Sequence, residues 1–217
     1  MKELKTQALC LRSVDYGEAN KILTLFSADF GKLSARVRSV KSPKSKLKQC
    51  SMPLCFGEYI LVKSGDFYTV TGCTVEESFF ASWSDVHKYS ASQIVLEALD
   101  RLSEVGTPEP QNLVSAVRVL EAINYSEVTP YIYATHFLIN LLPQQGIDIG
   151  EESELPYKIA HIFNAYRNAE VDELETLDFS MNDIIQSLTF VNIIYRDRLS
   201  ERFNSITEAL KILNTLL

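Results

Sequence analysis

The sequence predicts an α+β protein with two domains: a five-stranded β-barrel over residues 1–78, followed by an all-helical domain over residues 79–217. Three observations support this prediction. Apolar and polar residues alternate with a period of two in the first half, and after residue 76 the period becomes that of a helix. Residues 1–75 contain 12 Lys and Arg against 6 Asp and Glu, whereas residues 76–217 contain 9 against 22. The net charge of −7 therefore hides a basic first half.

The strands of the barrel are predicted from five short runs that are rich in Leu, Ile, Val, Tyr and Thr. These runs are 8–13, 22–27, 32–38, 59–63 and 67–75. Turn-forming residues separate them, and Ser64-Gly65-Asp66 favours a short hairpin between the last two. Five strands in so short a stretch suit a small barrel, and an OB-fold has that number of strands.

The stretch between Gly31 and Gly57 is strongly basic and contains no Asp or Glu. Because alternate side chains of a strand share a face, its first three cations are expected on one face of the third strand, and the others on a flexible loop. Such a row can neutralise successive phosphates and release condensed counterions. The alternative is a solvated loop that protects an edge strand from aggregation. The predicted nucleic-acid-binding residues are Lys32, Arg36, Arg38, Lys41, Lys44, Lys46, Lys48 and Arg12.

Aromatic side chains of the barrel could stack on nucleobases. The candidates are Tyr16, Phe26, Tyr59, Phe67 and Tyr68. A barrel of this size also needs large side chains to fill its interior, so each of them is expected to be buried rather than available for stacking.

The second half has helical spacing and several helix-end signals. A run of apolar residues from Ala91 to Val105 predicts a helix that stops at Gly106. Thr107-Pro108 and Thr129-Pro130 each predict a helix start, and the second opens a segment to residue 142 that is expected to be the central buried helix. Capping boxes at 180–183 and 205–208 predict two more starts. The acidic segments 150–154 and 172–175 are predicted to be solvated loops.

The sequence contains no recognisable catalytic or metal-binding motif. The four cysteines, at 10, 50, 55 and 73, form no CxxC pair, and the three histidines have no ligand spacing. Cys10 and Cys73 lie in predicted strands and are expected to be buried. Nucleophile and phosphate-loop motifs are absent, so the protein is predicted not to be an enzyme and to have no cofactor or metal. With no long apolar run and no signal-peptide pattern, a cytoplasmic location without membrane contact is expected.

At these residues the sequence resembles the RecO family of DNA repair proteins. Residues 8–13 followed by 16–22 are similar to the opening strand and Tyr-Gly-Glu turn of that family. Residues 23–35 are similar to its second and third strands, and 43–45 to its basic loop. The likeness is continuous from about residue 8 to residue 80, and in the helical half it lies in pattern rather than in motif.

The resemblance implies an OB-fold protein, associated with the nucleoid, that binds single- and double-stranded DNA and anneals complementary strands. It also implies that the protein works with RecR, and that the two together help RecA to displace single-strand-binding protein. It further implies that the helical domain contacts the acidic tail of single-strand-binding protein. The available cations there are Arg118, Lys158, Arg167, Arg196, Arg198 and Arg202. Many relatives carry a four-cysteine zinc site after the position of 142–150, but residues 150–156 contain no cysteine, so no zinc is expected. The alternatives are an RNA-binding OB-fold protein and a pure interaction adaptor.

Overall fold

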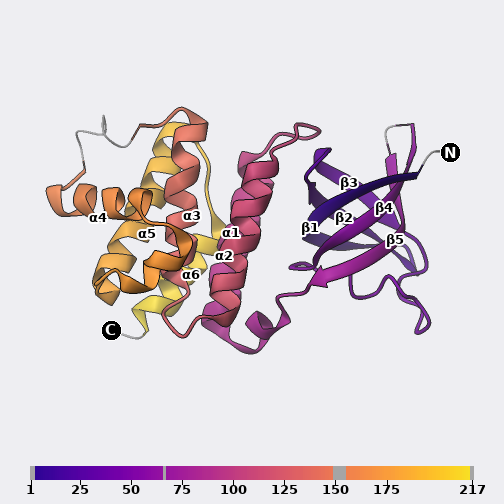
Figure 1. Ribbon diagram of the computed structural model, residues 1–217, viewed down its shortest axis with the longest axis horizontal. Coiled ribbons are helices and arrows are strands. Elements are labelled where there is room, and N and C mark those ends of the chain that lie inside the picture. The colour runs from indigo at the N-terminus through magenta and orange to yellow at the C-terminus, as the bar shows by residue number, and fades with distance from the viewer. Residues whose placement is uncertain (1–2, 66, 149–154, 216–217) are drawn as a thin grey trace. The chain divides into compact units, whose positions relative to one another are not determined.

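The computed structural model describes residues 3–65, 67–148 and 155–215, and its first part is a closed barrel (Figure 1). The strands are β1 (Glu3–Tyr16), β2 (Asn20–Ser27), β3 (Gly31–Val37), β4 (Phe56–Ser64) and β5 (Phe67–Glu77). Their order around the barrel is β1-β2-β3-β5-β4, and β4 pairs back with β1. The pairs are antiparallel except β3 with β5, which are parallel over 35–37 and 68–70. This five-stranded arrangement is the OB-fold, so the predicted fold class is confirmed.

The long strand β1 closes the barrel because it pairs on both sides. Its residues 3–9 pair with β4, and its residues 8–16 pair with β2. A β-bulge between Cys10 and Arg12 lies just after the change of partner. A bulge bends a strand and increases its twist, which allows one strand to belong to both sides of a small barrel. The barrel interior is filled mainly by aliphatic residues, among them Leu23, Leu25 and Leu61.

Helices make up most of the rest of the described chain. Short 3₁₀ segments lie at η1 (Phe80–Ser84), η2 (Leu142–Gln145) and η4 (Val171–Thr176). The α-helices are α1 (Val86–Leu102), α2 (Pro110–Tyr125), α3 (Tyr131–Leu141), α4 (Tyr157–Asn168), α5 (Met181–Leu199) and α6 (Asn204–Asn214).

The chain divides into two compact units, and the division falls within two helices. The first unit contains Met1–Phe80 and Leu99–Val117, so it includes the end of α1 and the first half of α2. The second contains Ala81–Ala98 and Arg118–Leu217. Each of these two helices thus contributes residues to both units.

The core of the second unit is built around α3. All but one of its residues are buried, Asn140 being the exception. Tyr195 of α5 donates a hydrogen bond of 2.8 Å to the carbonyl of Leu138 in α3, and its ring packs 5.2 Å from that of Phe203. The prediction of a central buried helix is confirmed, although the helix starts at Tyr131, one residue after the proline expected at its first position.

The expected helix ends around residue 106 are wrong, because Val105 and Gly106 pair with β3 instead. The helix α1 ends at Leu102, four residues before Gly106. Val105 forms a parallel bridge with Lys32, and the amide of Gly106 donates a 3.0 Å hydrogen bond to the carbonyl of Lys32. The next helix, α2, therefore begins only at Pro110, not at Pro108. Proline suits this first position because it has no N–H to leave unpaired.

Two further predictions about the helical segments also need correction. The capping box at Ser180 is present, but Ser205 does not cap α6, which begins at Asn204. The amides of Asn204 and Ser205 donate instead to the carboxylate of Glu97, at 3.2 and 2.7 Å. A partner distant in sequence thus satisfies the orphan donors of this helix. Residues 172–175 belong to η4 rather than to a loop, and the predicted loop at 150–154 lies outside the described residues.

Candidate nucleic-acid interface

The outer face of β3 carries cations, as the alternation predicts. Leu33, Ala35 and Val37 are buried in the barrel, whereas the residues between them are partly or fully exposed. The expectation that Arg38 belongs to the third strand is wrong, because β3 ends at Val37 and Arg38 is exposed in the bend that follows. The strand therefore carries Arg36 on its outer face, and the basic loop begins one residue earlier than expected.

Arg36 lies at the centre of this face. The register places it beside Ile22 of β2 on one side and Thr69 of β5 on the other. Its guanidinium carbon lies 5.9 Å from the centre of the Tyr16 ring, a cation–π distance. No ion pair of Arg36 or Arg38 is found among the described residues, so both charges remain available for phosphate.

Lys32 is placed differently from the other predicted residues. Only 14% of its side chain is exposed, and its ammonium lies 3.8 Å from a carboxylate oxygen of Asp100 and also donates to the Asp100 carbonyl. Arg12 approaches the other oxygen of the same carboxylate at 3.8 Å, with 66% of its side chain exposed. Arg12 can therefore turn to a ligand at little cost, whereas Lys32 is held within the first unit.

The loop between β3 and β4 is a chain of turns anchored on the barrel. Val40, Cys50 and Leu54 are buried, and the Leu54 amide donates to the Cys10 carbonyl at 3.0 Å. The hydroxyl of Tyr59 reaches from inside the barrel to the carbonyl of Cys50 at 2.7 Å. These anchors fix the loop at both ends and leave its lysines at the surface.

The lysines of this loop are exposed. Lys44, Lys46 and Lys48 make no ion pair within the described part of the chain. Lys41 bonds to Asp15 at 2.9 Å, and this hydrogen bond lowers the pKa of the Asp15 carboxyl. Arg36, Arg38 and the three lysines therefore lie at the surface without acidic partners among the described residues. In contrast, Lys32 and Arg12 share the carboxylate of Asp100, and Lys41 pairs with Asp15.

The aromatic residues of the barrel do not all behave as expected. Phe26 and Tyr59 are fully buried and Tyr68 is partly buried, but Tyr16 is 51% exposed and Phe67 is 69% exposed. The prediction of burial is therefore wrong for these last two. Tyr16 ends β1 and Phe67 begins β5, so each lies at the end of a strand.

All four cysteines lie in the barrel unit. Cys10, Cys50 and Cys55 are buried as small apolar residues, whereas Cys73, expected to be buried, is partly exposed. Burial raises the pKa of the Cys10 thiol and raises that of Cys55 to about 12. No group of three or more His, Cys, Asp or Glu is arranged to hold a metal ion among the described residues. Most of the segment compared with the zinc site lies outside them, so the absence of zinc stays a prediction.

The cations of the second unit are mostly paired with acids. Arg118 lies 3.7 Å from Asp172, Lys158 2.5 Å from Asp183, and Arg167 3.7 Å from Asp148. Arg196 bonds to its neighbour Asp197 at 2.6 Å, and Arg198 also has an interaction partner. For Arg202 no ion pair is found in the described ranges.

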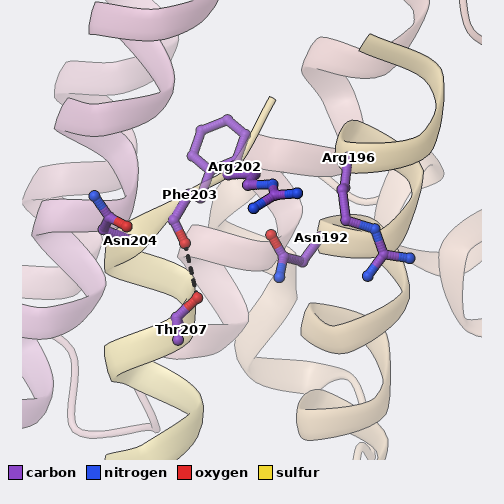
Figure 2. Close-up of a pocket in the computed structure, with 6 residues that line it drawn as sticks. All are labelled: Asn192, Arg196, Arg202, Phe203, Asn204 and Thr207. Carbon is purple, nitrogen blue, oxygen red and sulfur yellow. Dashed lines mark hydrogen bonds between the residues drawn. The ribbon is translucent and has the colours of Figure 1, made fainter. Parts of the chain in front are cut away.

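Arg202 and Arg196 line a pocket of about 420 Å³ at α5 and α6 (Figure 2). Its other lining residues are Asn192, Phe203, Asn204 and Thr207. The Thr207 hydroxyl donates to the Phe203 carbonyl at 3.1 Å, which fixes the first turn of α6 beside the pocket. The pocket combines two guanidinium groups with amide side chains and is suited to a carboxylate-bearing ligand.

No described helix is long and apolar enough to cross a membrane.

The barrel order and the basic outer face define the first unit as an OB-fold module, the fold whose second and third strands bind oligonucleotides or oligosaccharides in many proteins. Residues 1–79 match the family model described as "Recombination protein O N terminal". DNA repair protein RecO of Acetivibrio thermocellus is 30% identical over 146 residues, 67% of this chain and 58% of that protein. DNA repair protein RecO of Heliobacterium modesticaldum is 40% identical over 103 residues, 48% of this chain and 38% of that protein.

The chain belongs to the RecO family. The aligned stretches span 38% to 58% of the length of these two relatives. The match to the family model covers the barrel, which is where the sequence carries its continuous resemblance.

Proposed function

We propose that this protein is a DNA repair protein without catalytic activity, and that its barrel binds the DNA backbone. The observation that carries the proposal is the run of partly or fully exposed cations from Arg36 to Lys48 on an OB-fold. The relatives are named DNA repair protein RecO, and this supports a role in DNA repair. DNA fits as the ligand because this array of Lys and Arg, in which only Lys41 has an acidic partner among the described residues, can neutralise a polymer with one negative charge per nucleotide.

The proposed contacts are to phosphate rather than to base edges. The lysines of the loop are flexible point charges, and none of the described elements of the barrel is a helix that could enter the major groove. Binding of this kind carries little sequence information and falls steeply with salt. It also accommodates both single and double strands, since both expose phosphate.

The resemblance to RecO proteins extends the proposal to strand annealing and to work with RecR in loading RecA onto DNA covered by single-strand-binding protein. A cationic surface favours annealing because it reduces the repulsion between two phosphate backbones that approach each other. In this view the barrel supplies the DNA contact and the helical unit docks the partner proteins.

The DNA-binding proposal is tested by reversing the two charges that lead from β3 into the loop. The double variant Arg36→Glu and Arg38→Glu should weaken binding of labelled single-stranded DNA. It should also flatten the plot of log affinity against log salt by roughly 0.7 for each phosphate that the protein no longer neutralises. Arg36→Lys with Arg38→Lys is the matched control, since it keeps both charges and should keep the salt slope. Unchanged affinity in a folded double Glu variant would refute this interface.

The same titration separates the competing functions. Single-stranded RNA of equal length and sequence is measured beside DNA. Tighter RNA binding would favour the RNA-binding alternative, because a basic face by itself does not distinguish the two polymers. Binding of neither polymer at low salt would leave the interaction adaptor as the remaining function of the chain.

The proposed docking of an acidic protein tail has a specific candidate in Arg202. No acidic partner of Arg202 is found in the described ranges, and Arg202 lines the pocket of Figure 2. Arg202→Glu should weaken binding of a labelled peptide that carries the acidic tail of single-strand-binding protein, by tenfold or more if the charge pair is desolvated (about 1.4 kcal/mol per tenfold). Lys211→Glu is the control because that lysine already pairs with Glu208 at 2.7 Å. Equal effects of both variants would refute the pocket.

A further inference from the structure

Tyr16 is an exposed aromatic residue next to the turn of the first hairpin. It ends β1, opposite Asn20 of β2, and 51% of it is accessible to solvent. The turn that follows is also open: a Cβ built on Gly17 would meet nothing within 4 Å. A planar ligand can therefore reach the ring without any movement of the barrel.

Tyr16 belongs to a small apolar surface rather than standing alone. Val14 is 51% exposed on the same face of β1, and it pairs directly with Ile22, which is 36% exposed. Ile22 in turn pairs with Arg36, whose guanidinium lies over the Tyr16 ring. These four residues (Val14, Tyr16, Ile22 and Arg36) form one continuous patch across β1, β2 and β3, called here the stacking patch.

The charges around the stacking patch are favourable for an anionic ligand. Arg36 itself has no acidic partner among the described residues, and Arg38 and the lysines of the loop follow it in the chain. Asp15, the acid next to Tyr16, is bonded to Lys41 at 2.9 Å, so its charge is compensated. Glu18 in the turn is a second carboxylate close to Tyr16 in the sequence, and its side chain is exposed to solvent that screens it.

We propose that the stacking patch binds an unpaired nucleobase, with Tyr16 as the stacking platform and Arg36 as the cation that holds both the ring and the adjacent phosphate. This inference rests on the proposed DNA binding and refines it. In a duplex the bases are already stacked and paired, so only single strands or frayed ends can use the patch. The patch therefore adds a preference for single strands to a backbone contact that has none.

The occupant is inferred from the combination of surfaces. A protein partner would be expected to pair acidic side chains with the cations and to cover the apolar residues as well. A nucleotide satisfies both with one repeating unit, because its base has an apolar π-face and its phosphate is anionic. An aromatic ring with a guanidinium against it is also a stable platform, since Arg stacks on aromatic faces through its planar group.

The experiment compares Tyr16→Ala with Tyr16→Phe on single- and double-stranded DNA at one salt concentration, and then repeats the single-strand titration at a second. Loss of a stacked base costs about 1–3 kcal/mol, so Tyr16→Ala should weaken single-strand binding roughly 5- to 150-fold. Duplex affinity should change less than about twofold, and the salt slope should stay the same because every phosphate is still neutralised. Tyr16→Phe keeps the aromatic face and should bind single strands as the unchanged protein does.

A direct readout is the fluorescence of 2-aminopurine placed within the single strand. Stacking quenches this base, so the unchanged protein and Tyr16→Phe should alter its emission, and Tyr16→Ala should not. Tyr157→Ala is the matched control for removal of an exposed tyrosine, since Tyr157 is 91% exposed on α4 of the second unit. Thermal unfolding of each variant shows whether the barrel is intact.

The outcomes separate the two proposals. If the unchanged protein binds neither single nor double strands, the proposed DNA binding fails and the patch fails with it. If it binds both and Tyr16→Ala weakens neither, or weakens both equally, DNA binding stands and the stacking patch is refuted. A weakening confined to single strands, with no change for Tyr157→Ala, supports the patch.

Discussion

Gly31 and Gly17 have nearly the same backbone conformation, with φ of +62° and +64°, but very different surroundings. A Cβ on Gly31 would lie 2.0 Å from the carbonyl oxygen of Thr107, which is backbone and cannot turn aside. A Cβ on Gly17 would meet nothing within 4 Å. The two glycines therefore separate the cost of a left-handed conformation from the cost of a collision.

Gly31→Ala should destabilise the protein by about 3 kcal/mol or more, since it adds a backbone clash to the strain of positive φ. Gly17→Ala should cost only the conformational part, about 1–2 kcal/mol. Urea unfolding followed by circular dichroism measures both. Similar losses of stability for the two variants would show that Gly31 and Thr107 do not approach each other closely in solution.

The sequence predicted which side chains of β3 face outward, but not the partners of those side chains. Alternation along β3 correctly placed Arg36 on the outer face. It could not reveal that Lys32 meets Asp100, because that contact joins residues 68 positions apart. Tyr16 was misjudged for a related reason: period-two alternation assigns a face, but the exposure of that face depends on what covers it.

At the scale of whole elements, the start of α5 is stabilised by a charged cap. Asp183 accepts hydrogen bonds from the amide and hydroxyl of Ser180 at 3.2 and 2.6 Å and pairs with Lys158. These contacts, first of all the one with Lys158, lower the pKa of the Asp183 carboxyl below its ordinary value. The charged state of this carboxyl therefore favours the folded protein.

The contribution of Asp183 to stability should be present above about pH 4, the range of an unfolded aspartate, and should be lost as the pH falls through the lower folded pKa. At about pH 6, Asp183→Asn should lower the free energy of unfolding by about 1 kcal/mol. The difference from the unchanged protein should shrink as the pH is lowered below about 4 in urea titrations. Asp197→Asn, in an exposed pair, should shift the urea midpoint little at either pH. If the difference in free energy of unfolding between Asp183→Asn and the unchanged protein stays constant with pH, the charged cap is contradicted.

Strands and helices were predicted more reliably than their ends. The five strands and the buried α3 follow from local alternation and apolar content, which the sequence states directly. The failures at α1, α2 and α6 share one physical cause. Each of these ends is decided by a residue far away in the chain: Lys32 of β3 for the segment after α1, and Glu97 for the first turn of α6. Local capping signals such as Thr107 and Ser205 cannot compete with such contacts.

At the scale of the whole molecule, the two units can be followed separately by their own probes. All four cysteines lie in the first unit, and the single tryptophan, Trp83, lies in the second, 5.7 Å from the ring of Tyr89. Thiol reactivity therefore reports unfolding of the barrel, and tryptophan fluorescence reports unfolding of the helical unit.

We expect the two probes to show the same urea midpoint. Helices α1 and α2 each supply residues to both units, so a unit that unfolds would free part of a helix that the other unit also uses. Coincident transitions are the ordinary test for a single cooperative step. Midpoints that differ by more than the fitting error would show that the units unfold independently despite the two helices they have in common.

The short pairing of Val105 and Gly106 with β3 bears on where the chain can be cut. The parallel contact of β3 with β5 covers only residues 35–37, so on that side the beginning of β3 is paired by Val105 and Gly106. A fragment ending at residue 79 would remove this partner, together with the carboxylate of Asp100 that holds Lys32. Unpaired strand backbone is a template for another copy of the chain, and such a fragment should self-associate. A fragment that continues to residue 117 would keep the pairing and is the better choice for studying the barrel by itself.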